Sequence, residues 1–481
     1  MTSCGPLRKS AVIRLALPSG DLRVPVARLL SSGLRVEGYG EGSRSYRLRV
    51  RGREDVAVRV FREKDIPIQI ALGNYDLGVC NLTWVMEMQA RFPDQPIVAL
   101  QDMAVGACGL YAAGAEAVCN SLADLRLMPV VRIASDHPNL AEAFAMAARL
   151  PVYRIQAVWG AAEAYPPEDA DVAVVAASDE SALRQEGLQP LFCLLESSAW
   201  LIANATSLVS KDLSSVLRPL MGVGQSHVGT LRLPPPLPAS TRRARPTPER
   251  RVLRMAVPDG HQQRYVVDAL WAGGLPLEGY DESRCLRRPV SSLVGLEVKA
   301  IRPHDMPQLV ATGEMGLAVT GRDCLMEHLY RFPSSPVVEV LDLGRGQFDL
   351  SAVVSEELPA TTIAEALERW RSQGKAVLRV AAELPAVADH YARSRHFWRY
   401  QVIPIAGASE GFVPEDADLL IEGTETGRTL AENRLKAVDV LFRSTTCVIA
   451  RRDASLGGRR REVFEEVMGA LRRAVGAPQR V

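Results

Sequence analysis

The sequence of 481 residues lacks the features that mark a disulfide scaffold, a zinc site or a membrane protein. Its eight cysteines are scattered, with no Cys-x-x-Cys pair and no Cys/His pair at zinc-binding spacing, which favours reduced thiols. The longest apolar run, around residues 103–115, is too short to span a bilayer, which takes roughly 20 residues. Segment 1–20 has no apolar core of signal-peptide length. We therefore expect a soluble cytoplasmic protein and disfavour a secreted solute-binding protein.

The sequence also lacks a strong net charge and a recognisable nucleophilic catalytic set. With 57 basic and 56 acidic side chains, the formal net charge is +1, which argues against nucleic acid or an acidic membrane surface as a partner. The seven histidines are isolated, so no Ser/His/Asp or Cys/His arrangement is visible. A hydrophobic content of 47% is ordinary for a globular protein.

What the chain does contain is the same sequence pattern twice. The Arg91-Phe92-Pro93 triplet returns as Arg331-Phe332-Pro333, and other early landmarks also recur 240 residues later. Later landmarks recur 247 residues apart, so the second copy carries a short insertion. So long a period indicates duplicated domains rather than a solenoid, whose repeats run roughly 20–50 residues.

Within each copy, short apolar strands alternate with helical patterns, which favours an α/β fold with mainly parallel sheets. Each copy has two such series, so we expect two lobes around a cleft, joined by return strands. The predicted divisions are a first copy at 11–208, a Pro/Arg-rich linker at 209–251, a second copy at 252–452 and a C-terminal packing helix within 453–481.

The most informative segment is a Gly- and Thr-rich turn at 423–429, between a buried-type strand and a helical pattern. Backbone N–H groups at such a helix start bind phosphate. Thr426 and Thr429 add hydroxyl donors and Arg428 adds charge, whereas Glu422 and Glu425 suit sugar hydroxyls or water-bound magnesium. Taken alone, a plain helix cap is the more frequent explanation of such a turn.

The first copy supports the functional interpretation because it has lost these residues. The second copy has Glu422, Thr426, Gly427 and Thr429 where the first has Val175, Asp179, Glu180 and Ala182. Carboxylates at Asp179 and Glu180 would repel a phosphate. We expect an anion site in the second copy alone.

The second copy resembles the catalytic region of ATP phosphoribosyltransferase, the first enzyme of histidine biosynthesis. Glu422 through Leu430 resembles its phosphoribosyl-pyrophosphate (PRPP) motif, with Glu422 in place of the usual Asp. Residues 302–307, 315–317 and 342–346 resemble three further motifs. The resemblance covers almost all of both copies and implies two tandem bilobal domains of the type II periplasmic-binding-protein kind.

The resemblance implies transfer of the phosphoribosyl group of PRPP to ATP, with Mg²⁺ and release of pyrophosphate. Catalytic roles are implied for Glu422, Glu425 and Arg302. PRPP would bind Thr424, Thr426, Gly427, Arg428, Thr429 and Leu430. The region of ATP and pyrophosphate would comprise Asp305, Arg322, Asp342, Gly344, Arg345 and Gly346, with no protein side chain as a direct metal ligand. The alternative is an inactive sensor of a nucleotide or phosphorylated sugar with the same fold.

Two departures from the family pattern concern cations. The family's Pro-Lys-Gly-Arg segment is matched by Pro258-Asp259-Gly260-His261, and the arginines expected after Gly346 are replaced by residues 347–349, Gln-Phe-Asp. Polyphosphates would then depend on magnesium and on Arg302, Arg322, Arg345 and Arg428. The resemblance also implies a possible homo-oligomer, and regulation either by a separate histidyl-tRNA-synthetase-like subunit or by the first copy.

Overall fold

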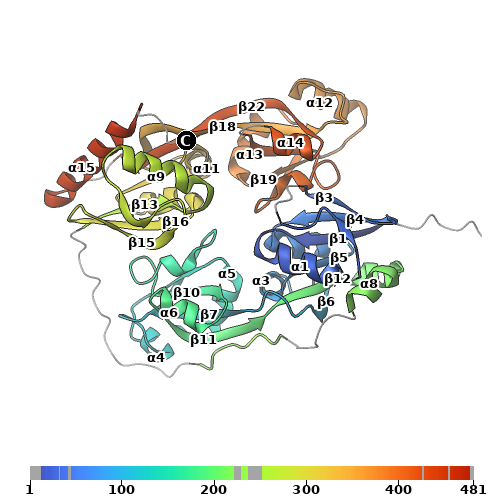
Figure 1. The fold of residues 1–481 in the computed structure, drawn as a ribbon, viewed down its shortest axis with the longest axis horizontal. Coiled ribbons are helices and arrows are strands. Elements are labelled where there is room, and N and C mark those ends of the chain that lie inside the picture. Colours follow the sequence, from blue (N-terminus) through green and yellow to red (C-terminus); the bar gives the residue numbers. More distant parts are fainter. Residues whose placement is uncertain are drawn as a thin grey trace, which may run out of the picture.

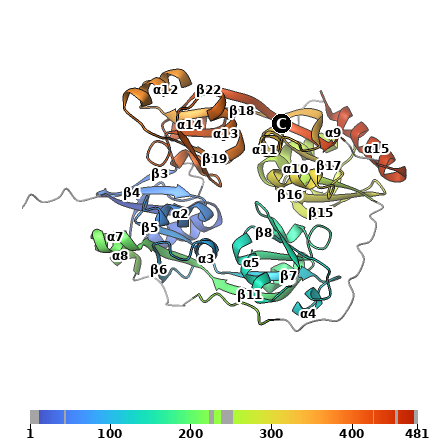
Figure 2. The same ribbon diagram turned by 180° about the vertical axis from the view of Figure 1, so that it is seen from behind.

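The computed structural model of the chain describes residues 12–31, 33–41, 45–150, 152–221, 229–236, 252–424, 427–452 and 456–476. Four α/β lobes form a ring, two from each copy (Figures 1 and 2). We number them along the chain: lobe 1 comprises 12–102 and 199–221, lobe 2 comprises 108–197, lobe 3 comprises 253–341 and 444–474, and lobe 4 comprises 348–443. The expected bilobal architecture is confirmed for both copies.

Lobe 1 is built on a seven-stranded sheet of order β2-β3-β4-β1-β5-β12-β6. Five of the six residues of β1 are buried, as expected for a strand covered on both faces. Helices cover the sheet, and Asp65 precedes α2 with Pro67 in its first turn, as predicted. The elements are β1 Ile13–Pro18, α1 Arg23–Leu30, β2 Val36–Glu37, β3 Arg47–Val50, β4 Arg53–Phe61, α2 Ile66–Ala71, β5 Leu77–Asn81, α3 Leu82–Arg91, β6 Ile97–Asp102, β12 Ala199–Asn204, α7 Ala205–Ser210 and α8 Ser214–Met221.

Lobe 2 has a five-stranded sheet of order β11-β7-β10-β8-β9. Strand β10 runs parallel to β8 but antiparallel to β7. Its elements are β7 Cys108–Ala115, α4 Leu122–Leu125, β8 Val131–Ser135, α5 Pro138–Ala147, β9 Tyr153–Ala157, β10 Val172–Ala177, α6 Glu180–Gln185 and β11 Leu188–Ser197.

In the second copy, two long strands run through both lobes and join them into one sheet. These are β18 (Val337–Ser355) and β22 (Leu435–Arg451), in the order β16-β13-β17-β22-β18-β21-β19-β20. The other elements of lobe 3 are β13 Leu253–Pro258, α9 Gln263–Ala272, β14 Leu277–Tyr280, β15 Cys285–Ser291, β16 Leu296–Ile301, α10 Met306–Ala311, β17 Leu317–Gly321, α11 Arg322–Arg331 and α15 Gly458–Ala474. Those of lobe 4 are α12 Ile363–Ser372, β19 Leu378–Ala382, α13 Pro385–Ser394, β20 Tyr400–Pro404, the 3-10 turn η6 Ser409–Gly411, β21 Leu419–Thr424 and α14 Arg428–Glu432.

The prediction of mainly parallel sheets was too simple. The strands that pass between lobes, such as β12 in the first copy and β22 in the second, pair antiparallel with their neighbours. Because a crossing strand must return to the lobe it left, it runs against the strands that started there. The parallel pairs lie within single lobes, for example β1 with β4, β8 with β9 and β19 with β20.

The C-terminal helix α15 packs as predicted, with Val463, Val467 and Leu471 buried in the core of lobe 3. The first copy has a counterpart in α8, within the segment predicted as linker. A methyl group placed on Gly273 would lie 2.3 Å from the carbonyl oxygen of Ala470 in α15, and one on Gly33 would lie 2.7 Å from that of Pro219 in α8. Both glycines therefore permit the same close approach of a terminal helix.

The two copies face each other across a pseudo-two-fold axis. Lobe 1 packs against lobe 4, and lobe 2 packs against lobe 3. The backbone N–H of Ala406 donates to Asp65 (3.0 Å), and that of Trp159 donates to Asp305 (3.2 Å). Such a reciprocal pattern is that of an isologous dimer. The tandem copies thus form a dimer within one chain.

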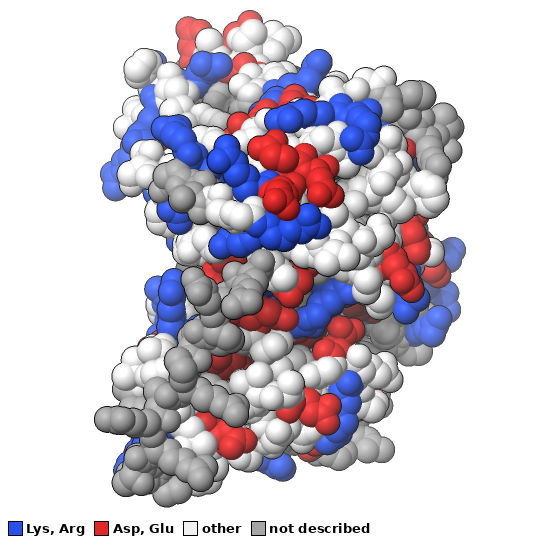
Figure 3. Space-filling model, turned by 90° about the vertical axis from the view of Figure 1, so that its left-hand side faces the viewer, with Lys and Arg blue, Asp and Glu red and all other residues white. Residues whose placement is uncertain are grey.

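The two packed interfaces differ in the partners of one equivalent buried aspartate, although lobes 1 and 4 also share an ion pair of Arg59 with Glu415 at 2.6 Å. Between lobes 2 and 3, Asp169 receives two hydrogen bonds from Arg254, both 2.7 Å, and one from Lys299 at 2.9 Å. The counterpart between lobes 1 and 4, Asp416, accepts a hydrogen bond from the hydroxyl of Tyr75 at 2.8 Å. Charged side chains of both signs lie along the junction of lobes 2 and 3 in Figure 3. In the described residues, no helix is long and apolar enough to cross a membrane.

Candidate functional site

The predicted phosphate loop follows β21 at the carboxyl edge of the parallel strands of lobe 4. Gly427 has φ +70°, a left-handed conformation that glycine adopts without strain. It caps α14 with no side-chain hydrogen bond to the first turn, which leaves those N–H groups to another acceptor. The Thr424 hydroxyl is buried without a hydrogen-bond partner in the described structure. Glu425 and Thr426 lie outside the described residues.

Glu422 lies in an acidic environment that favours its protonated form. Burial and the neighbouring Glu410 carboxylate raise the pKa of Glu422 to about 8. The Ser409 hydroxyl and the Gly423 N–H donate hydrogen bonds to its two oxygens. Burial also raises the pKa of Glu383, which follows β19 at the same edge. A protonated Glu422 can donate as well as accept a hydrogen bond, as a sugar hydroxyl requires.

The first copy fills the corresponding helix start with its own carboxylate. Asp179 caps α6 by accepting hydrogen bonds from the Ala182 N–H at 3.0 Å and the Ser181 hydroxyl at 2.5 Å. These bonds lower the pKa of Asp179. A carboxylate already occupies the place of an anion at α6, whereas no described side chain caps α14. Thr426, the counterpart of Asp179, lies outside the described residues.

A cavity of about 660 Å³ lies where the four lobes meet, and both copies line it. Lobe 3 contributes His261 and Tyr265, and lobe 4 contributes Glu383 and Ala406. The first copy contributes Arg62 and others. None of the described loop residues 423–424 and 427–429 lines this cavity. The loop adjoins it through Phe348, a lining residue whose ring would lie 2.9 Å from a methyl group on Gly423.

Two arginines predicted near ATP and pyrophosphate are held by carboxylates. Arg322 binds Glu339 (2.7 and 2.9 Å) and Asp342 (2.8 Å). Arg345 is buried, with an ion pair to Asp268 at 3.3 Å. Neither lines the cavity, whereas Gly346 does. Asp342 and Gly344 lie in the bulged part of β18 that joins lobes 3 and 4, where Gly344 has φ +65°.

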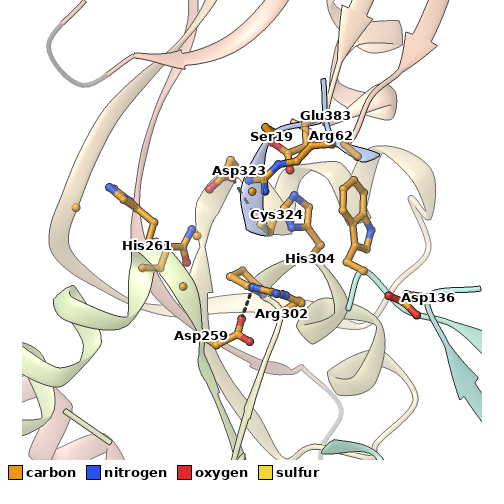
Figure 4. Close-up of a pocket in the computed structure, with 18 of the residues that line it drawn as sticks. Ser19, Arg62, Asp136, Asp259, His261, Arg302, His304, Asp323, Cys324 and Glu383 are labelled. Atoms are coloured by element: carbon orange, nitrogen blue, oxygen red, sulfur yellow. Dashed lines mark hydrogen bonds and ion pairs between the residues drawn. The ribbon is translucent and has the colours of Figure 1, made fainter. Parts of the chain in front are cut away.

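Asp305 and Arg302 lie on the side of the cavity that faces the first copy. Asp305 is buried against lobe 2, where burial raises its pKa to about 7 and the Tyr165 hydroxyl donates to it at 3.0 Å. Arg302 forms an ion pair with Asp259 at 3.2 Å (Figure 4) and lies next to Gly160 of lobe 2. The structure thus brings Glu422, Thr424 and Gly427 together but places Arg302 against the other copy.

The loop residues beyond Gly427 have separate surroundings. Arg428 is exposed and pairs with Glu432 at 2.8 Å, so it is available to a ligand only if that pair opens. The Thr429 carbonyl accepts from the Asn433 side chain at 2.9 Å. Leu430 is buried in the core, which suits support of the loop more than direct contact with a ligand.

The residue set that sequence reasoning missed comes from the first copy. Arg62, the counterpart of Arg302, lies between Gly20 of lobe 1 and Gly407 of lobe 4. Figure 4 shows Arg62 beside Glu383 and Ser19. The spacing of 240 residues marked Arg62 and Arg302 as equivalent, but it carried no signal of which lobe each one contacts.

Sequence comparisons match both copies to one family. A sequence model of the family "ATP phosphoribosyltransferase" matches residues 62–222 and again 302–473. An ATP phosphoribosyltransferase of Moorella thermoacetica is 32% identical over 47% of this chain and 94% of its own length. One from Deinococcus radiodurans is 31% identical over 44% of this chain and 87% of its own length. The solved ATP phosphoribosyl transferase (HisG:HisZ) complex from Thermotoga maritima has 21% identity, a TM-score of 0.38 and coverage of 47% of this chain and 100% of the matched chain.

The matches cover both copies and more than half of the chain. The protein therefore belongs to the ATP phosphoribosyltransferase family, and it carries the family's catalytic region as a tandem duplication.

Proposed function

We propose that the chain transfers the phosphoribosyl group of PRPP to ATP with release of pyrophosphate, and that the second copy holds the site. The observation that carries this proposal is the contrast between the copies: α14 begins at an uncapped Gly427, whereas Asp179 caps α6. Family membership supports the reaction, and histidine biosynthesis is the pathway that this activity serves.

The proposed chemistry needs positioning more than a nucleophile of the protein. A ring nitrogen of ATP forms a bond to the anomeric carbon of the ribose, while the bond from that carbon to the pyrophosphate oxygen breaks and the electron pair leaves with pyrophosphate. Holding the two substrates in line supplies much of the rate. Donors aimed at the leaving oxygens supply more. We assign the 5′-phosphate to the loop of Thr424–Thr429 and the ribose hydroxyls to Glu422 and Glu425.

We assign Mg²⁺ to the substrate rather than to a protein site. Among the described residues, no group of three or more His, Cys, Asp or Glu side chains is arranged to hold a metal ion. Magnesium bound to pyrophosphate oxygens neutralises charge that this cleft, with few family cations, must accommodate. Glu422 with its raised pKa would contact such an ion through water after losing its proton.

Cellular context is part of the proposal. A cytoplasmic location, a homo-oligomer and a histidyl-tRNA-synthetase-like regulatory subunit are properties that the family suggests. The duplicated chain already contains the paired arrangement of two catalytic regions, so a regulatory subunit would meet a pseudo-symmetric surface.

The direct test is incubation of purified protein with ATP, MgCl₂ and PRPP, followed by measurement of released pyrophosphate. We expect release that depends on both substrates. Ligand binding without release would contradict the proposed activity and support a sensor of the same fold. Glu180→Gln, in the first copy, is the matched control for loop variants because Glu180 is the counterpart of Gly427.

A further inference from the structure

The carboxyl edge of lobe 4, which carries the phosphate loop, is covered by lobe 1 of the first copy. Asn433, just after α14, accepts a hydrogen bond from the Tyr46 N–H at 3.0 Å. A methyl group on Gly411, in η6, would lie 3.3 Å from Cβ of Tyr46. The Asp65–Ala406 hydrogen bond fixes lobe 1 at the same edge. The surroundings of the loop therefore come from both copies.

Two cations of the first copy point from this contact into the cavity. Arg62 lies against Gly407, whose added Cβ would be 3.1 Å from Nε of Arg62. Lys64, two residues further, has its Nζ 4.5 Å from the ring centre of Trp159. No ion pair or hydrogen bond joins either cation to another described residue. Burial raises the pKa of Glu383, and Lys64 and Arg62 offset part of this rise, which places all three groups near one another.

The equivalent positions in the second copy carry no such available charge. Arg302 is paired with Asp259, which also binds Arg287 at 2.6 Å. His304, the counterpart of Lys64, is stacked on Trp159 with ring centres 4.3 Å apart. Burial lowers the pKa of His304 to about 4, so its ring is neutral at pH 7. Unpaired positive charge is therefore supplied by the first copy.

The size of the side chains that line the cavity also differs between the two copies. Trp159 of lobe 2 has Ala406 as its counterpart in lobe 4, and Trp84 has Cys324. All four positions line the cavity. The indole of Trp84 stacks on His137 with ring centres 4.0 Å apart. The first copy thus places two indole rings at the cavity, whereas the second copy has alanine and cysteine at the equivalent positions.

We propose that Arg62 and Lys64 of the first copy bind the diphosphate or triphosphate oxygens of a substrate held in the cleft of the second copy. This inference rests on the proposed function and assigns the first copy a part in it. The two side chains replace cations that the second copy lacks at Asp259 and His261. The role assigned to both side chains is binding by positive charge.

The test is steady-state kinetics of Arg62→Ala and Lys64→Ala in the full chain. We expect the KM for PRPP or ATP to rise about tenfold or more in each, because each variant loses a charge-assisted hydrogen bond to the polyphosphate. Lys64→Arg should recover most of the affinity. Arg154→Ala, which removes an exposed cation from β9, controls for net charge, and thermal melting without ligand should be unchanged in all variants.

Arg302→Ala is the decisive comparator because the sequence predicted that residue instead. If the first copy supplies the cations, the KM should rise at least ten times more in the Arg62 variant than in the Arg302 variant. The reverse order, or wild-type KM values in the Arg62 and Lys64 variants of an active enzyme, would overturn the inference and leave the proposed function standing.

Calorimetric titration with magnesium pyrophosphate separates this inference from the activity. Wild-type binding that is lost in the Arg62 and Lys64 variants supports the composite anion site even if no transfer to ATP occurs. Wild-type binding that both variants retain refutes it. If the wild type neither binds pyrophosphate nor turns over, both proposals are wrong.

Discussion

Asp169 is the residue whose removal should most weaken the association of the two copies. It lies in lobe 2 with its side chain fully buried and holds Arg254 and Lys299 of lobe 3. Its pKa lies well below the usual value because hydrogen bonds and charge from Arg254 and Lys299 outweigh burial. Asp169→Asn keeps the size of the side chain and removes only the charge.

The expected cost is about 3–5 kcal/mol, the range for removing one partner of a buried ion pair. Two cations would stay behind: Arg254, only 5% exposed, and Lys299, 6% exposed. Glu168 still pairs with Lys299 at 2.6 Å, so the lower part of this range is expected. The matched control is Asp416→Asn at the equivalent position between lobes 1 and 4. Its partner is a neutral tyrosine, so the cost should be about 1 kcal/mol.

Hydrogen–deuterium exchange reports each interface separately. The Trp159 N–H belongs to the interface of lobes 2 and 3, and the Ala406 N–H to that of lobes 1 and 4. Asp169→Asn should speed exchange of the peptide around Trp159 roughly a hundredfold or more, since 1.4 kcal/mol is tenfold in an equilibrium. It should leave the peptide around Ala406 less affected. Equal effects of the two Asn variants, or no change near Trp159, would refute the assignment of this charge network as the main contact.

Three further outcomes are expected. Gly427→Asp should abolish phosphate binding, measured by calorimetry, because a carboxylate would cap α14 as Asp179 caps α6; retained binding in this variant would contradict the loop assignment. Glu422 has a pKa raised to about 8 from an ordinary 4.5, so its contribution to stability is present below about pH 4.5 and lost as pH rises through 8. Glu422→Gln should therefore gain more stability over wild type at pH 8.5 than at pH 5 in urea denaturation, by up to about 1.4 kcal/mol per pH unit, and a constant difference would count against the shifted pKa. Gly273→Ala should lower the melting temperature, because the new methyl group would meet the Ala470 carbonyl at 2.3 Å, and an unchanged melting temperature would show that α15 can move away.

Much of the fold could be predicted because it depends on local patterns and on repetition. The Asp and Pro that begin α2 also begin α10. A pattern that occurs in both copies supports the prediction of the same helix in each. The sequence also showed that the two helix starts differ, since Asp179 is a strong helix cap. Its counterpart Thr426 lies outside the described residues, and α14 begins at Gly427, which has no side chain. Local chemistry of this kind needs no knowledge of tertiary contacts.

The composition of the site could not be predicted to the same extent. Which lobe a side chain contacts depends on how the copies pack, and Arg62 and Arg302 have nearly identical sequence surroundings. A motif also does not show whether its arginine is available: Arg322 and Arg345 are held by Glu339 and Asp268, which lie at distant or unmarked positions in the sequence. Cations in such pairs are positioned by long-range packing.

The residues at which each copy ends could not be predicted from the sequence either. Helix α8 has the structural place of α15, but the two helices share too little sequence pattern to be matched by spacing. Residues 229–236 then run back along lobe 2, where the Arg232 N–H donates to the Leu194 carbonyl at 2.7 Å. Residues 222–228 and 237–251 of the predicted linker lie outside the described residues.

Covalent fusion across the pseudo-two-fold axis changes how this molecule can evolve. In a homodimer every substitution appears on both sides of the axis at once. A tryptophan that fills one cleft therefore fills the other cleft as well. Here a single gene encodes the two sides separately, and the partner is always present in a one-to-one ratio at an effective concentration that dilution cannot reduce. One side is then free to specialise as scaffold while the other keeps the chemistry.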